Sequence, residues 1–164
     1  MLERPVNVSS ASAPASASAL INIAIYYMIA EFYSILPTAF IVYTLYIDPL
    51  FGLYMIAINL VAELIKLFVV HEDHPMTLRP KEAANCDILL CNGPQGLKPG
   101  FLSGHMTFAT LFGLYFYGLT GNILYLHVIP IMAYARYALK CHNVPQIVAG
   151  FILGVVAFNI YGIN

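Results

Sequence analysis

Two histidines in this chain stand in surroundings suited to the chemistry of a phosphate group. His142 lies four residues before Gln146, so on a helix the two side chains share one face, and the amide carbonyl can accept from the imidazole. His105 ends residues 98–105, a Lys-Pro-Gly-Phe-Leu-Ser-Gly-His segment. We expect this segment at the start of a helix, where free backbone N–H groups and the helix dipole favour an anion. The two histidines therefore indicate a site for a negatively charged group.

Basic side chains accompany both histidines. Arg79 precedes a proline and could offer phosphate oxygens a guanidinium fork of fixed direction. Arg136 lies six residues before His142, and Lys66 lies three residues after Glu63, with which it can pair on one helical face. The other lysines belong to the same polar segments: Lys81, Lys98 and Lys140. This clustering of positive charge also indicates an anion site.

The composition indicates a chain that lies in a lipid bilayer. Hydrophobic residues make up 60% of the 164 residues and charged residues only 9%, against about 25% charged in an average soluble domain. Long apolar runs are broken only by brief polar loops. The net charge of -1 excludes a basic nucleic-acid surface. Because lipid leaves backbone groups no partner outside the segment, each membrane span is expected to be a helix.

Five apolar stretches are expected to cross the bilayer, which takes about 20 residues per helix. They comprise residues 33–47, 49–70, 103–119, 122–137 and 144–160. Glu31 is expected near the lipid headgroups, because a charge at mid-bilayer is costly. Successive spans cross the bilayer in alternate directions. One membrane face is therefore expected to hold the end of the second span, the start of the third, and the connection between the last two. The sequence thus predicts an all-α, multi-pass integral membrane helix bundle.

The chain divides into a tail and one membrane domain. Residues 1–18 are rich in Ser, Ala and Pro and are predicted to be a disordered tail. Residues 19–164 form the predicted membrane-embedded helical domain. Within it, residues 71–102 make the only sizeable polar loop, and long ordered loops tend to be functional. We therefore expect this loop to contribute to the active site.

Other polar residues are given ordinary structural roles. Residues 71–74, His-Glu-Asp-His, lack the spacing of a helical zinc motif and are expected to be a solvated loop. His127 is expected at the opposite membrane interface. Among the three cysteines, Cys86 and Cys91 lie close enough in sequence to pair, but unpaired packing thiols are favoured, Cys141 included.

The basic and histidine segments resemble the type 2 phosphatidic acid phosphatase and haloperoxidase superfamily over residues 60–155. The superfamily pattern is K-x6-R-P, then P-S-G-H, then S-R-x5-H-x3-D. The resemblance implies a phosphatase without metal or cofactor, in which His142 forms a phosphohistidine and His105 protonates the leaving oxygen. It implies that five residues hold the phosphate: Arg79, Arg136, Ser103, Gly104 and Lys66. The amino-acid sequence between Arg79 and His105 also resembles that of members from large DNA viruses of algae and protists.

The chain departs from this pattern at four positions. Gln146 replaces the Asp that orients the nucleophile, as it does in the glucose-6-phosphatase and dolichyl-diphosphatase branches. Lys66 stands thirteen residues before Arg79 rather than seven. Leu102 replaces the usual Pro and Ala135 the usual Ser, which should loosen the turn before the first histidine and remove one phosphate hydrogen bond. Slow turnover is expected.

The sequence therefore predicts a membrane enzyme that hydrolyses a lipid phosphate or lipid diphosphate, with membrane lipids around it. Two alternatives stay open. The protein could be a catalytically degenerate relative with a structural role in a membrane, or a phosphotransferase that passes the phosphate to an alcohol. The side of the membrane that the site faces is open too, because the positive-inside rule counts charges that the chemistry also requires.

Overall fold

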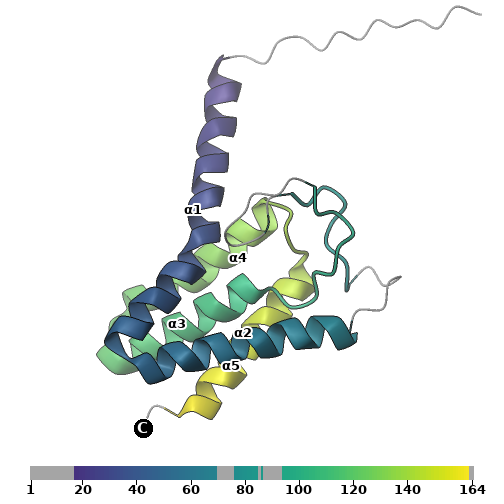
Figure 1. Ribbon diagram of the computed structural model, residues 1–164. Coiled ribbons are helices and arrows are strands. Elements are labelled where there is room, and N and C mark those ends of the chain that lie inside the picture. Colours follow the sequence, from purple (N-terminus) through teal and green to yellow (C-terminus); the bar gives the residue numbers. More distant parts are fainter. Residues whose placement is uncertain (1–16, 70–75, 85, 87–93, 163–164) are drawn as a thin grey trace, which may run out of the picture.

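The chain folds into a bundle of helices in a computed structural model that describes residues 17–69, 76–84, 86 and 94–162 (Figure 1). The elements of this described part are α1 (Ala17–Ile47), α2 (Pro49–Val69), α3 (Gly104–Thr120), the 3₁₀-helix η1 (Ile123–His127), α4 (Val128–Ala138) and α5 (Val144–Tyr161). Within the same residues there is no strand, only two isolated bridges in the loop before α3. The predicted all-α class is confirmed.

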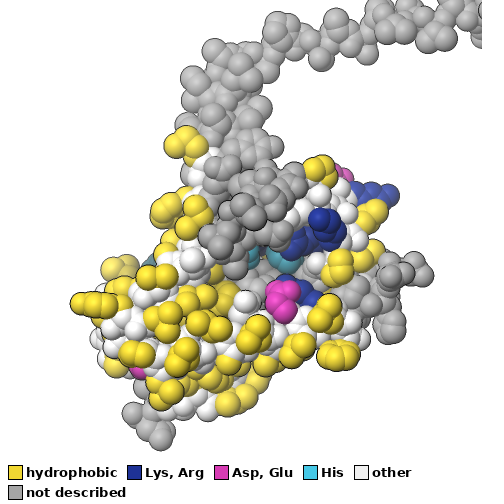
Figure 2. Space-filling model, in the orientation of Figure 1, with side chains coloured by type: hydrophobic (Ala, Val, Ile, Leu, Met, Phe, Trp, Pro, Cys, Tyr) yellow, Lys and Arg dark blue, Asp and Glu magenta, His cyan; other side chains and the backbone are white. Residues whose placement is uncertain are grey.

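Two helices are long and apolar enough to cross a membrane, namely the stretches Pro49–Phe68 of α2 and Val144–Tyr161 of α5. The prediction of five spans is not confirmed. The stretches Ile35–Ile47 and Ile123–Ala138 are apolar but shorter, and the second of them is divided between η1 and α4. Hydrophobic side chains are nevertheless spread widely over the coloured part of the face seen in Figure 2, while the Lys and Arg side chains gather in one region beside a histidine.

Helix α1 is longer than the predicted first span. It begins at Ala17 and continues through Pro37 to Ile47, and its first half extends away from the other helices (Figure 1). The predicted tail lies outside the described residues up to position 16, and Glu31 is also outside the described side chains.

Helix α3 is the central element and packs closely against α5. A Cβ atom added at Gly150 would lie 2.4 Å from the carbonyl oxygen of Ser103, and one added at Gly154 would lie 2.6 Å from the Cβ of Thr110. Small residues four positions apart allow two helix backbones to approach in this way. The contact is extended by Thr107, whose hydroxyl donates to the carbonyl of Gly150 at 3.1 Å. The starts of α3 and α5 are therefore held side by side.

The turn between α1 and α2 is held by a carboxylate. Asp48 caps α2, because its Oδ1 accepts from the N–H of Phe51 at 3.1 Å. Its Oδ2 accepts from the hydroxyl of Tyr115 at 2.5 Å, and these hydrogen bonds lower the pKa of Asp48. The ring of Tyr115 stacks on Phe51 with centroids 3.6 Å apart. Asp48 thus joins three helices at the end of the bundle away from the basic residues.

Candidate active site

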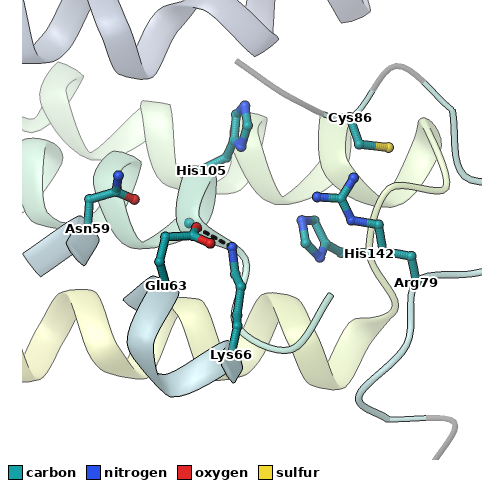
Figure 3. Close-up of a pocket in the computed structure, with 8 residues that line it drawn as sticks. Asn59, Glu63, Lys66, Arg79, Cys86, His105 and His142 are labelled. Atoms are coloured by element: carbon teal, nitrogen blue, oxygen red, sulfur yellow. Dashed lines mark hydrogen bonds and ion pairs between the residues drawn. The ribbon is translucent and has the colours of Figure 1, made fainter. Parts of the chain in front are cut away.

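A polar cavity of about 240 Å³ lies at the end of the bundle where the basic residues gather (Figure 3). Its lining residues come from α2, from the loop before α3, from the start of α3 and from the connection between α4 and α5: Asn59, Glu63, Lys66, Arg79, Cys86, Gly104, His105 and His142. The predicted convergence of these segments is therefore observed. Five of the residues predicted from the sequence line one cavity.

His142 is held by two carbonyl oxygens. Its Nδ1 lies 3.1 Å from the carbonyl of Gly100 and 3.2 Å from the Oε1 of Gln146. Both partners can only accept, so the hydrogen resides on Nδ1 and the Nε2 atom keeps its lone pair. The side chain is buried, with 3% of its surface exposed. The imidazole is therefore fixed in orientation, with an Nε2 atom that is able to act as a nucleophile.

Gln146 can orient His142 because its amide is fixed on both sides. Its Nε2 donates to the carbonyls of Met76 at 3.0 Å and Leu78 at 2.8 Å. With both amide hydrogens used, the Oε1 atom must face His142. The same Oε1 accepts from the N–H of Asn143 at 3.3 Å, while the side chain of Asn143 accepts from the N–H of Gln146 at 3.0 Å, which forms a capping box at the start of α5.

Gly100 allows the loop to approach His142, a role that could not be predicted from the sequence. A Cβ atom at this position would lie 2.6 Å from the Cγ of Arg79 and 3.2 Å from the Nε2 of Gln146. The N–H of Gly100 donates to the carbonyl of Thr77 at 2.8 Å. Only a residue without a side chain brings its own carbonyl to His142 in so narrow a space.

Arg79 is oriented by a buried glutamine. Its Nη1 donates to the Oε1 of Gln95, which also accepts from the N–H of Cys86 at 3.2 Å. The backbone of Arg79 is fixed as well, because its N–H donates to the carbonyl of Lys98 at 2.9 Å. Gln95 is 1% exposed. The role of Gln95 could not be predicted from the sequence, since Gln95 belongs to no motif and meets Arg79 only through the fold of the loop.

Arg136 lies behind the cavity rather than in its lining. It is fully buried in the last turn of α4, and its Nη2 donates to the carbonyl of Cys86 at 2.6 Å. The backbone carbonyl of Arg136 accepts from the N–H groups of Cys141 at 3.1 Å and His142 at 3.3 Å. The end of α4 therefore fixes the backbone of His142.

The expected state of the cysteines is wrong. Cys86 and Cys141 form a disulfide across a sequence separation of 55 residues, with Cα atoms 5.4 Å apart. Closeness in sequence favoured Cys86 and Cys91, but the fold brings the loop onto the connection after α4, and this contact decides the pairing. Cys91 and the His-Glu-Asp-His residues 71–74 lie outside the described residues.

Helix α2 supplies the opposite wall of the cavity. Lys66 and Glu63 pair with their charged atoms 2.5 Å apart, as expected from their spacing. Figure 3 places this pair and Asn59 across the cavity from Arg79 and His142. The spacing of the three polar residues, at i, i+4 and i+7 on an otherwise apolar helix, was the available signal for Asn59 and Glu63. The unusual distance of Lys66 from Arg79 in sequence does not prevent both from reaching the cavity.

The start of α3 contributes backbone and imidazole to the cavity. Ser103 is the N-cap, and its Oγ accepts from the N–H of Met106 at 3.4 Å. The hydroxyl is fully buried and is not among the lining groups, so its predicted contact with phosphate stays a prediction. Gly104 and His105 do line the cavity. Leu102, which replaces the usual Pro, has a φ of 62°, a value that a proline ring excludes.

The cavity thus combines an oriented histidine, a second histidine, basic groups and a helix start. A sequence model of the PAP2 superfamily matches residues 50–162. The chain belongs to the PAP2 superfamily. No curated protein and no solved structure matched the chain. The family match gives no information about a viral source.

Members of the PAP2 superfamily are generally phosphoric-ester hydrolases, and the family match supports phosphatase-type activity for this member. The match spans α2 to α5, and all the residues that line the cavity lie within it. Helix α1 precedes it entirely. The part of the chain that forms the cavity is therefore also the part that carries the family relationship.

The pKa of His142 in this PAP2 member lies well below the ordinary histidine value of 6.5. Burial is the main cause, followed by the positive charges of Arg136 and Arg79. A lowered pKa keeps the imidazole neutral as the pH falls through 6.5, so the nucleophile stays available. Because the unfolded chain would bind this proton more readily, acidification below 6.5 lowers the stability of the fold.

This shift predicts the acid limb of the pH profile. We expect kcat/KM, which reports the free enzyme, to keep its value as the pH falls to 6.5 and to decline only below it. The measurement compares two substrates whose phosphate groups ionise at different pH values, because a limb due to the substrate moves with the substrate. A fall in kcat/KM toward acid that both substrates share, with its midpoint above 6.5, would contradict the neutral His142.

Proposed function

We propose that this protein is a membrane phosphatase that hydrolyses a lipid phosphate or lipid diphosphate through a phosphohistidine at His142. The observation that supports this most strongly is the double anchoring of Nδ1 by Gly100 and Gln146, which leaves Nε2 as the free nucleophilic atom. The cavity beside it is bordered by Lys66 and Arg79, and basic groups of this kind favour a phosphoryl group.

In the first step, Nε2 of His142 attacks phosphorus, and the bond from phosphorus to the leaving oxygen breaks. His105 donates its proton to that oxygen, so the alcohol or phosphate leaves in neutralised form. In the second step, His105 accepts a proton from water, whose oxygen attacks the phosphohistidine. The N–P bond breaks and inorganic phosphate is released, which restores both histidines.

The remaining groups act by positioning and by charge. Arg79 and Lys66 border the cavity and would neutralise the equatorial phosphate oxygens, with the positive charge of buried Arg136 behind them. The N–H of Gly104, at the first turn of α3, adds a donor on the axis of the helix dipole. Gln146 stabilises the positive imidazole of the intermediate through its carbonyl oxygen.

A lipid is the proposed substrate because one wall of the cavity belongs to α2. On this helix the polar residues Asn59, Glu63 and Lys66 line the cavity, while apolar side chains of the same turns are exposed: Leu60, Val61, Leu64, Leu67 and Phe68. Since α2 is long and apolar enough to lie in a bilayer, an acyl or prenyl chain could follow its surface while the phosphate enters the cavity. A multi-pass membrane location is part of the same proposal.

The role of His105 provides the test of this function. Phosphate release is measured in detergent with EDTA, from phosphatidic acid, from a prenyl diphosphate and from p-nitrophenyl phosphate. For His105→Asn we expect kcat/KM, which reports only the steps up to formation of the phosphohistidine, to fall by about 10²-fold or more with phosphatidic acid, whose alkoxide leaving group needs a proton. The loss should be much smaller with the nitrophenyl ester, whose leaving group does not. An equal loss for both substrates would contradict the assignment, and silence of the wild type on all three would favour the degenerate, structural alternative.

A further inference from the structure

Cys86 connects the two arginines assigned to the phosphate. Its backbone carbonyl accepts from Nη2 of the buried Arg136 at 2.6 Å. Its backbone N–H donates to Oε1 of Gln95 at 3.2 Å, and the same oxygen accepts from Nη1 of Arg79. One peptide segment therefore contacts Arg136 directly and Arg79 through Gln95, from its two sides.

The disulfide attaches this segment to the nucleophile. Cys86 is bonded to Cys141, which precedes His142 in the chain and whose N–H donates to the carbonyl of Arg136 at 3.1 Å. Both cysteines are buried, and among the described residues the apolar cluster around them adds only Ala83 and part of Leu139. So small a cluster contributes little burial energy. The covalent bond is therefore the strongest constraint on the position of Cys86.

We propose that the Cys86–Cys141 disulfide is a positioning element of the phosphate site, so that the affinity of the site for phosphate depends on the redox state of this bond. The proposal rests on the phosphatase function proposed above. A dithiol reductant converts the bond into two thiols and is itself oxidised to a disulfide. The Cys86 peptide then loses its covalent attachment to the residue before His142, and the acceptors that it offers to Arg136 directly and to Arg79 through Gln95 are less firmly placed relative to His142. Binding a phosphate must then order this segment again, which weakens binding.

The same proposal has a consequence for the membrane side of the site. Disulfides of this kind persist in oxidising compartments and are reduced in the cytosol. We therefore expect the cavity to face the lumen of an organelle, the periplasm or the exterior. Extraction of the native protein with a thiol-blocking reagent present should recover Cys86 and Cys141 as a disulfide, and recovery of both as blocked thiols would overturn the proposal.

The experiment uses the full chain in detergent with Cys91→Ser, which leaves only Cys86 and Cys141. The protein is compared before reduction, after dithiothreitol and after reoxidation, with Cys86→Ser/Cys141→Ser as a permanent reduced counterpart. We expect the KM and the inhibition constant of inorganic phosphate to rise by about tenfold or more on reduction, as for the loss of a charge-assisted hydrogen bond, and to return on reoxidation. Cys91→Ser itself should match the wild type.

The outcomes separate a positioning role from a stabilising one. If the disulfide only stabilises the fold, reduction lowers Vmax by reducing the folded fraction, while KM and the phosphate inhibition constant of the remainder stay unchanged; this result overturns the proposal. If neither redox state hydrolyses any ester, the phosphatase function has failed instead. Direct calorimetric titration with inorganic phosphate then decides, because only the positioning role makes the oxidised protein bind phosphate more tightly than the reduced one.

Discussion

His142→Ala is expected to lower the rate of phosphate release by at least about 10³-fold, because it removes the atom that attacks phosphorus. The fold should be little affected, since the hydrogen bonds of the imidazole go to Gly100 and Gln146 and none of them connects two helices by itself. Inorganic phosphate should therefore still bind to the basic groups of the cavity. The measurement is the steady-state rate, together with the affinity for phosphate of the same preparation.

A matched control for this prediction is His127→Ala. His127 is an exposed histidine at the end of η1 and is not among the cavity residues, so its removal should leave the rate at the wild-type value. Gln146→Leu should give a loss between these two, because it removes the carbonyl that orients Nδ1 but leaves Gly100 as an acceptor. Equal rates for His142→Ala and the wild type would exclude the nucleophile assigned here.

Leu102→Pro is the substitution with the largest expected effect on stability, although it restores the residue that the superfamily pattern has at this position. Proline requires a φ near -65°, whereas Leu102 has a φ of 62°. The change would therefore force a new backbone path directly before Ser103, which caps α3. We expect it to cost about 3 kcal/mol or more, measured as a large fall in the melting temperature in detergent.

Leu102→Gly is the matched control for this backbone effect. It loses the same buried side chain, which is only 5% exposed in the wild type, but glycine adopts a positive φ without strain. The difference in melting temperature between the two variants thus isolates the backbone term. If the proline variant is as stable as the glycine variant, the positive φ of Leu102 is not required by the fold.

Local patterns sufficed to predict the parts of the site that lie close together in sequence. The pair of Glu63 and Lys66 follows helical spacing, so it could be inferred before any fold was known. His142 contacts Gln146 as expected, but it lies before Asn143, the N-cap of α5, so the two residues do not share one helical face. The start of α3 was also predicted, because residues 98–105 were expected at the beginning of a helix. These segments meet at the cavity as expected, although the five membrane crossings assumed in that expectation are not confirmed.

Contacts that depend on the path of the loop could not be predicted. Gln95 orients Arg79, and Gly100 supplies a carbonyl to His142, yet nothing in the sequence near either residue indicates its partner. The disulfide is the clearest case, since its two cysteines are 55 residues apart and three cysteines allow several pairings. The lengths of the helices could not be predicted from the hydrophobic pattern either. Hydrophobicity alone does not reveal that the fourth apolar stretch is divided into η1 and α4.

The proposed covalent bond between His142 and phosphorus can be tested by trapping the phosphorylated protein during turnover. The wild type is mixed with a substrate labelled with radioactive phosphorus, quenched in alkali within the first turnover and digested for peptide analysis. We expect an acid-labile, alkali-stable phosphohistidine at His142 that is absent from His142→Ala. Turnover without any labelled protein in the wild type, or a label on another residue, would contradict it.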